Sequence, residues 1–181
     1  ASRGVRATTV RDIADAAGIL SGSLYHHFDS KESMVDEILR GFLDDLFDRY
    51  HKIVASGLDS RATLEALVTT SYESIDRSHS AVAIYQDEAK HLEGERFAYI
   101  AERNTEFREL WIGVLERGVA DGTFRPHLDV ELVFRFVRDT VWVAVRWYRP
   151  GGALTVEQVA QQYLSIVLDG LSNPDLHKEQ S

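Results

Sequence analysis

Small and polar side chains gather near the start of the chain, where their types suit contact with nucleic acid. The segment Ser21–Phe28 reads SGSLYHHF. Leu24 and Phe28, four apart, can face a neighbouring helix and leave the other positions outward. The outward set is Ser21, Gly22, Ser23, Tyr25, His26 and His27. Small residues let a backbone approach base edges, and hydroxyl and imidazole groups suit phosphate oxygens. DNA contact is therefore favoured over an ordinary helical hairpin with a polar outer face.

Arg138 and Trp142 form a second set, four apart on a largely apolar segment. A buried guanidinium needs a carboxylate or an anionic ligand. Asp139 projects about 100° away around a helix, which makes it a poor partner for Arg138. We therefore expect a ligand pocket in which Arg138 holds an anion and Trp142 stacks on an apolar or ring-bearing portion. The alternative is an ion pair with another helix or subunit. Further candidate pocket walls, each also open to a plain core role, are Tyr72, Tyr85, Phe107 and Trp111.

Carboxylate–histidine spacing offers a different kind of site. Glu88 and His91 have the i, i+3 spacing of di-iron helical bundles, and Asp48 with His51 comes near it. Such a site also needs two further inward glutamates. The sequence has no cysteine, nucleophile elbow, glycine-rich phosphate loop or metalloprotease helix signature. We therefore expect no catalytic residue, no metal and no cofactor, with a four-helix carboxylate/His metal-binding enzyme that does not bind DNA as the alternative.

Three helices separated by turns must position the polar segment. Thr9 followed by Asp12 resembles a capping box, and Gly18 suits the end of the first helix. Two short helices across a glycine turn form a helix-turn-helix, which places the second helix in the DNA major groove. A third helix should begin at Asp29 or Ser30. It continues with apolar residues four apart on one face, namely Met34, Ile38, Phe42, Leu46 and Tyr50.

Beyond this segment the pattern is helical almost throughout, with helices expected over about 62–78, 79–92, 95–120, 129–149 and 155–171. We predict an all-α chain. A helix-turn-helix DNA-binding domain covers 1–47, a helical ligand-binding and dimerisation domain covers 48–174, and 175–181 form a tail. The helix over 129–149 is apolar nearly all round, which predicts burial against a second subunit. A central core helix of a monomer is the alternative.

Charge is distributed unevenly along the chain. The total is minus nine, but residues 1–31 carry four basic against three acidic side chains, so they hold plus one and the remainder minus ten. A near-neutral DNA-binding region joined to an acidic remainder is compatible with DNA binding. The reason is that the electrostatic field close to the DNA groove matters more than the net charge of the whole chain. The longest apolar runs are far short of a membrane span, and we expect a cytoplasmic protein that does not contact membranes.

Gly18-Ile19, Gly22–Phe28 and Ser30-Lys31-Glu32 resemble the DNA-binding signature of TetR-type repressors over about thirty contiguous residues. The resemblance implies a homodimer, joined by its last two helices, on a palindromic double-stranded DNA operator, and a small-molecule effector. It implies base contacts by Arg11, Ser21, Gly22 and Ser23, and backbone contacts by Tyr25, His26 and Lys31. Leu20 departs from the pattern, where a small polar cap is usual. The resemblance also implies one more helix before Thr9, of which we expect Ala1–Gly4 to be the tail.

The whole chain is most similar to the actinobacterial repressors of cholesterol catabolism within this family, particularly those governing late ring degradation. That similarity implies a coenzyme A (CoA) thioester of a steroid-ring fragment as the effector that releases the repressor. An anionic, part-polycyclic ligand would suit Arg138 with Trp142. A fatty acid or a cationic drug is the alternative effector.

Overall fold

The computed structural model describes residues 9, 27–92 and 94–171, and within these ranges every regular element is a helix. The α-helices are α4 (Lys31–Ala55), α5 (Ser60–Arg77), α6 (His79–Glu88), α7 (Tyr99–Ala120), α8 (Val130–Trp142) and α9 (Val156–Leu171). Short 3₁₀ helices are η1 (Ala89–His91), η2 (Glu95–Phe97) and η3 (Val143–Arg146). The all-α prediction is confirmed. Six predicted DNA-binding residues lie outside the described residues, namely Arg11, Ser21, Gly22, Ser23, Tyr25 and His26.

Side-chain caps determine where several helices begin. The Ser30 hydroxyl accepts from the backbone N–H of Ser33, whose own hydroxyl accepts from the N–H of Ser30, each at 3.1 Å. Asp59 caps α5 by accepting from the N–H of Ala62 at 2.7 Å. Thr155 and Gln158 cap α9 reciprocally. Each cap satisfies backbone donors that have no partner inside the helix, so these starts follow from local sequence.

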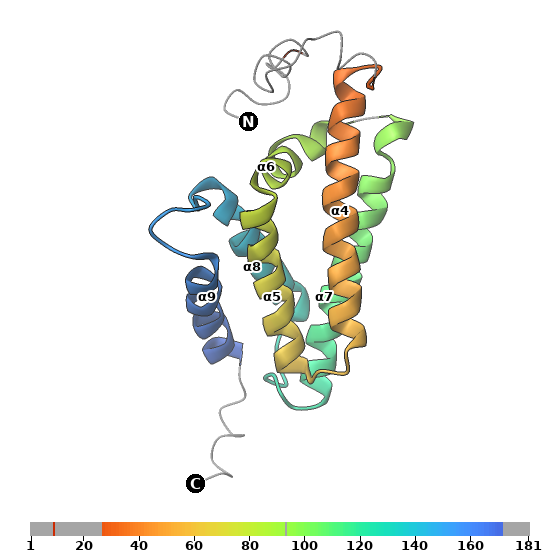
Figure 1. The fold of residues 1–181 in the computed structure, drawn as a ribbon. Helices are drawn as coiled ribbons and strands as arrows, with labels where there is room; N and C mark the ends of the chain where they lie inside the picture. The colour runs from red at the N-terminus through yellow and green to blue at the C-terminus, as the bar shows by residue number, and fades with distance from the viewer. Residues whose placement is uncertain (1–8, 10–26, 93, 172–181) are drawn as a thin grey trace.

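Helix α5 is the central element of the body. It contacts α4, α6, α7, α8 and α9, and Figure 1 shows it between α9 on one side and α4 with α7 on the other. Its inward face is fully buried at Leu64, Leu67 and Ile75. Helix α4 runs along the edge of the bundle as a long rod. The segment Ser21–Phe28, which is predicted to contact DNA, is called the reading segment below. Because α4 starts shortly after it, α4 connects the reading segment to the body.

The inward face of α4 differs from the prediction at one position. Ile38 is 44% exposed, whereas its neighbour Leu39 is fully buried. The other four predicted positions, Met34, Phe42, Leu46 and Tyr50, are buried. Residues four apart drift by about 40° per step around a helix with 3.6 residues per turn, so the series does not define the whole buried face, which also includes Val35, Leu39 and Leu43.

The predicted single helix over 129–149 is also wrong in part, because the α-helix ends at Trp142 and continues as the 3₁₀ turn η3. The N–H groups of Trp147 and Tyr148 both donate to the carbonyl of Ala144. Such tightening is common at helix ends. Pro150 follows closely and disfavours helical backbone at the residue before it.

Two glycines of α7 should respond oppositely to alanine substitution. A Cβ at Gly118 would overlap the ring of Phe124, which is 1% exposed, whereas a Cβ at Gly113 meets nothing within 4 Å. We expect Gly118→Ala to lower the free energy of unfolding by about 2 kcal/mol through overpacking. Gly113→Ala should raise it by roughly 0.5–1 kcal/mol, since alanine favours helix. Thermal unfolding of both variants tests this, and shifts of Tm in the same direction would contradict it.

Candidate functional site

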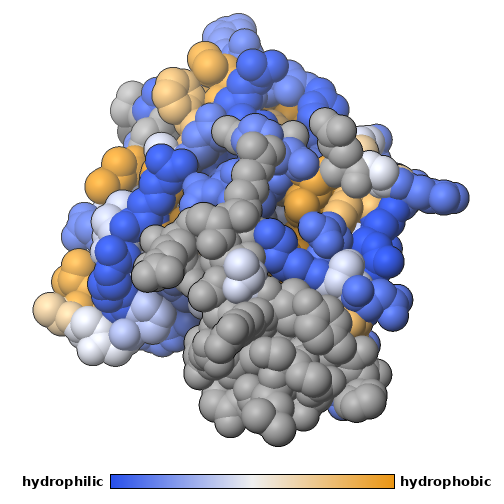
Figure 2. All heavy atoms as spheres, turned by 90° about the horizontal axis from the view of Figure 1, so that it is seen from above, coloured by the Kyte–Doolittle hydropathy of each residue, from blue (hydrophilic) through white to orange (hydrophobic). Residues whose placement is uncertain are grey.

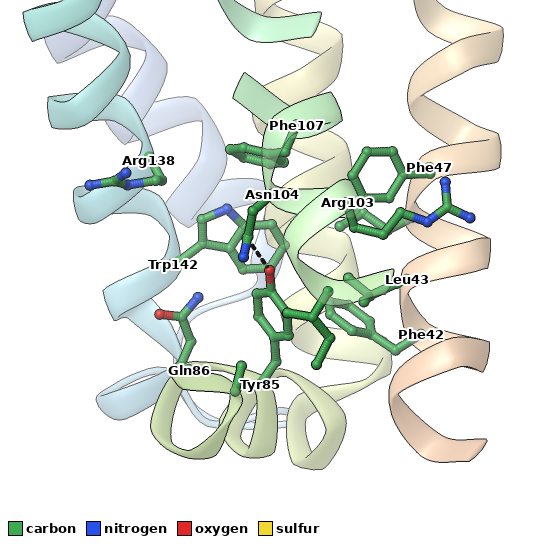
Figure 3. Close-up of a pocket in the computed structure, with 13 residues that line it drawn as sticks. Phe42, Leu43, Phe47, Tyr85, Gln86, Arg103, Asn104, Phe107, Arg138 and Trp142 are labelled. Carbon is green, nitrogen blue, oxygen red and sulfur yellow. Dashed lines mark hydrogen bonds between the residues drawn. The ribbon is translucent and has the colours of Figure 1, made fainter. Parts of the chain in front are cut away.

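A cavity of about 290 Å³ lies between α4, α6, α7 and α8. Figure 3 shows side chains from these helices converging on it. Most of the lining side chains are aromatic or aliphatic, and a few polar groups stand among them. The lining residues are Phe42, Leu43, Leu46, Phe47, Tyr85, Gln86, Ala89, Ile100, Arg103, Asn104, Phe107, Arg138 and Trp142.

Aromatic rings form the inner wall of the cavity. The indole of Trp142, 6% exposed, lies 6.2 Å from the ring of Phe42 in an edge-to-face arrangement and 6.4 Å from that of Phe107. Phe107 in turn packs 5.9 Å from Phe134 beneath it. Rings held this way present flat apolar surfaces, and pockets of this kind bind apolar and ring-bearing ligands.

A pair of neutral polar groups lies within this apolar wall. The hydroxyl of Tyr85 donates to Oδ1 of Asn104 at 2.6 Å, as drawn in Figure 3. Burial raises the pKa of Tyr85 to about 12, so the phenol keeps its proton at neutral pH. The Asn104 side chain retains its amide N–H groups as donors toward a ligand. The pair can therefore orient a carbonyl or hydroxyl group without adding charge.

Arg138 lies at the rim of the cavity and differs from the prediction in its partner. Its Nε donates to Oδ1 of Asp139 at 2.7 Å, and the side chain is 45% exposed. The expectation that Asp139 would be a poor partner is therefore wrong, because at an exposed position the two side chains can bend around the helix surface. The guanidinium lies 5.5 Å from the ring of Phe134, and in Figure 3 it points away from Trp142.

A second hollow, of about 250 Å³, adjoins the first. Gln86, Arg138 and Trp142 line both, and Arg146 with Val143 and Val145 extends the second along η3. Arg146 lies 3.6 Å from Asp87 in an exposed ion pair. The apolar cavity therefore opens beside two guanidinium groups that water can reach. A ligand with an apolar part and an anionic part would find both environments within one continuous lining.

Arg103 is a cavity residue that the sequence analysis did not identify. It lies on α7, where its guanidinium donates to Oδ1 of Asp44 at 2.7 Å and to Oε2 of Glu106 at 2.8 Å. The same group lies 4.8 Å from the Phe47 ring centroid. Partial desolvation opposes its charge, but the hydrogen bonds to Glu106 and Asp44 outweigh this and raise the pKa of Arg103, so it is a fixed cation.

Four of the six predicted pocket residues line the cavity, namely Tyr85, Phe107, Arg138 and Trp142. Tyr72 and Trp111 do not. Tyr72 packs at 5.6 Å against Tyr163 of α9, and burial raises its pKa. Trp111, 2% exposed, stacks between Tyr50 and Phe107 in the core. Both residues therefore pack in the interior of the body. Their helical spacing in the sequence suits an interior position as well as it suits a pocket wall.

Among the four residues of the metal-bundle alternative, Asp48, His51 and His91 are exposed and Glu88 is partly exposed, and they do not converge. Nε2 of His51 lies 2.8 Å from Glu106, and Asp48 pairs with Lys52 on its own helix. Across residues 27–92 and 94–171 there is no group of three histidines or carboxylates placed to hold a metal ion. In the same ranges, no helix combines the length and apolarity that crossing a bilayer requires.

Lys31 is the predicted DNA-contacting residue that the structure describes. It is the first residue of α4, directly after the Ser30 cap, and is partly exposed. Figure 2 looks onto the end of the molecule where α4 begins, and the coloured surface there is mostly hydrophilic with smaller hydrophobic patches. The structure thus places Lys31 at the junction between the long connecting helix and the reading segment.

Comparison with known proteins identifies the family. The model for bacterial regulatory proteins of the tetR family matches residues 1–38, and the model for the tetracyclin repressor-like C-terminal domain matches residues 57–171. The HTH-type transcriptional repressor KstR2 of Rhodococcus jostii is 81% identical over 175 residues, covering 96% of this chain and 86% of that protein. KstR2 of Mycobacterium tuberculosis is 61% identical over 173 residues, covering 95% and 86%.

Solved structures agree with this assignment. The ketosteroid transcriptional regulator KstR2 of M. tuberculosis superposes with a TM-score of 0.92 at 61% identity, covering 95% of this chain and 88% of that one. AibR in complex with isovaleryl coenzyme A and operator DNA superposes with a TM-score of 0.78 at 25% identity, covering 91% and 89%. The relatives are regulators and not enzymes, which excludes the metal-bundle enzyme. Two domain matches and 81% identity across nearly the whole sequence show that this chain belongs to the TetR family of transcriptional repressors.

Proposed function

We propose that this repressor is released from its operator by an anionic small molecule bound between α4, α6, α7 and α8. The observation that carries the proposal is the pairing of an aromatic cavity with an arginine-bearing rim beside the helix that leads to the reading segment. The apolar part of the ligand would lie against Trp142 and Phe107. Its anionic part would bind Arg138 and Arg146, since guanidinium groups bind phosphates and carboxylates well.

A CoA thioester of a steroid-ring fragment fits these two environments best. A fused-ring acyl group suits the flat aromatic wall, and the phosphates of CoA suit the two rim arginines. The relatives support the same class of effector, because one is named a ketosteroid regulator and another is bound to isovaleryl coenzyme A. The cavity of about 290 Å³ has room for the acyl portion, so the CoA portion would extend over the rim.

The repressor is proposed to act as a homodimer through its last two helices. Large apolar side chains stand exposed along α8, η3 and α9, with Phe136 62% and Ile166 69% exposed. Large exposed apolar side chains gathered on neighbouring elements favour an interaction site. The other exposed apolar residues of this surface are Leu132, Val143 and Trp147. Two-fold symmetry would then present two reading segments to the half-sites of a palindromic operator in the cytoplasm.

Release follows from the position of α4 between the cavity and the reading segment. Arg11, Ser21, Gly22 and Ser23 are proposed to read bases, while Tyr25, His26 and Lys31 contact the backbone. Because the operator fixes the spacing of its half-sites, a ligand that moves α4 by a few ångströms weakens the fit of one reading segment to its half-site. The effector binds one position of α4 more tightly than the other. The ratio of these two effector affinities sets how far the effector can lower the affinity for the operator.

Titration of the repressor with DNA from around its own gene tests the proposed function. Operator binding would be measured alone and with isovaleryl-CoA, the CoA thioester of a decalin carboxylic acid, free CoA and the corresponding free acids. We expect tight, salt-sensitive binding that is relieved by the bicyclic thioester and not by its free acid. Relief by free acids alone would replace the thioester with a fatty or cyclic acid, and binding indifferent to every compound would refute the proposed class of effector.

Lys31 offers a separate test of the DNA contact. We expect Lys31→Ala to weaken binding to all DNA sequences alike and to reduce the slope of log affinity against log salt by about two, because the dimer loses two lysines and each neutralised phosphate contributes about one. Lys52→Ala is the control, because Lys52 lies near the opposite end of α4 and pairs with Asp48. An unchanged salt slope for Lys31→Ala would contradict a phosphate contact.

A further inference from the structure

Besides the His51–Glu106 pair, two groups of charged residues tie α4 to the segment that includes η2 and α7. In the first group, Arg40 pairs with Asp36, donates to the carbonyl of Arg96 at 3.0 Å and lies 3.9 Å over the ring of Tyr99. None of these residues lines the cavity. In the second group, Arg103 of α7 binds Asp44 of α4. Arg103 therefore differs from the first group because its side chain also lines the cavity.

The surroundings of Arg103 allow it to exchange partners. Its side chain is 28% exposed, and in Figure 3 it reaches beside Phe47 toward α4. Asp44 is 66% exposed, so water can solvate this carboxylate as soon as it leaves the guanidinium. Glu106 has a second partner in His51, at 2.8 Å, and lies on α7 with Arg103. Of the two carboxylates that bind Arg103, Asp44 is therefore the one on another helix and the more exposed one.

We propose that Arg103 is the residue that links effector binding to α4, because an oxygen of the bound molecule replaces Asp44 as its partner and thereby removes this tie between α4 and α7. This inference rests on the proposed function, and it names the contact through which the cavity acts. In the effector-free protein, the Arg103–Asp44 pair holds α4 in the position that binds the operator. A guanidinium has five donors in a fixed fork, so it can keep Glu106 while it turns from Asp44 to a ligand oxygen.

The two partners of this pair should affect effector binding in opposite directions. Asp44→Asn removes the competitor of the ligand and should tighten binding of the decalin thioester by about two- to five-fold, the range for an exposed ion pair. Arg103→Gln removes the group that receives the ligand and should weaken binding by about five-fold or more. Fluorescence or calorimetric titration of the intact protein measures both. A purely structural tie would shift both variants in the same direction, and that result would overturn the inference.

Asp48→Asn is the matched control. Asp48 lies one helical turn beyond Asp44 on α4, carries the same charge and pairs with Lys52 of its own helix. It should leave effector and operator affinity unchanged within two-fold. If Asp48→Asn tightens effector binding as much as Asp44→Asn does, the effect is one of net charge and the inference is wrong.

Operator binding without effector supplies a readout that does not depend on the ligand. Asp44→Asn and Arg103→Gln should weaken operator binding by a similar factor, about two- to five-fold, and the double variant should be no weaker than either one, because all three lack the same tie. Unchanged or additive losses would overturn the inference. Failure of every thioester to bind the wild-type protein would instead refute the proposed effector class, so the two failures are distinguishable.

Discussion

Replacing Phe136 by aspartate should separate the repressor into monomers and weaken operator binding by about 100-fold or more. Phe136 is 62% exposed in the single chain and stands on α8 one turn from Leu132, which is 50% exposed. In a two-fold interface each substitution occurs twice, so two carboxylates lose water without a partner. Several kcal/mol per buried ion is the usual penalty, and roughly 3 kcal/mol already corresponds to 100-fold.

The measurement is sedimentation or light scattering of the protein, followed by operator titration. Leu58→Asp is the control, because Leu58 is 43% exposed in the turn between α4 and α5, away from α8 and α9. It should remain dimeric and bind the operator normally. The exposed position of Phe136 in the single chain means that the monomer should keep its helical fold, while its Tm should fall because it lacks the stabilisation that association provides. A Phe136→Asp protein that is still a dimer would place the subunit contact on another surface.

The starts of α4 and α9 could be predicted because their causes are local. Ser30 and Thr155 cap helices through hydrogen bonds with residues three positions away. Four consecutive residues are therefore enough to predict each helix start. Ile38 shows the limit of counting by four, because Met34 and Phe42 on either side of it in the series are buried while Ile38 is 44% exposed, so spacing alone does not decide burial. The 3₁₀ turn after Trp142 depends on hydrogen bonds shared at Ala144, which periodicity does not reveal.

The site could be predicted in part for a similar reason. Arg138 and Trp142 could be found because a cation and an indole on an apolar helix are unusual, and Tyr85 and Phe107 because they are large aromatic residues. Tyr72 and Trp111 have the same residue types and the same helical spacing, yet they face the core. Arg103 was missed because its partner Asp44 is 59 residues away in the chain. The spacing of Arg103 and Phe107, four apart on α7, was the available signal.

Replacing Arg138 by alanine should strongly weaken release by the effector while leaving the operator complex intact. The substitution removes a hydrogen bond between charged groups, worth about 1.5–3 kcal/mol, so the effector concentration for half release should rise by roughly ten- to 100-fold. Folding should not suffer, because the side chain is 45% exposed and its ion pair is with its neighbour Asp139. Release would be followed by operator titration at increasing thioester concentration, with Tm recorded in parallel.

Arg61→Ala is the matched control for this substitution, since Arg61 is 43% exposed and forms an ion pair within its own helix, with Glu65. It should release as the wild type does. The Asp139 contact sharpens the interpretation further: if Asp139 competes with the ligand anion for Arg138, Asp139→Asn should favour release, in contrast to Arg138→Ala. Weaker operator binding by Arg138→Ala without effector would instead make Arg138 a structural residue. Arg138 would then no longer be a candidate for binding the anionic part of the effector. Arg146 alone would have to supply the positive charge that an acyl-CoA requires.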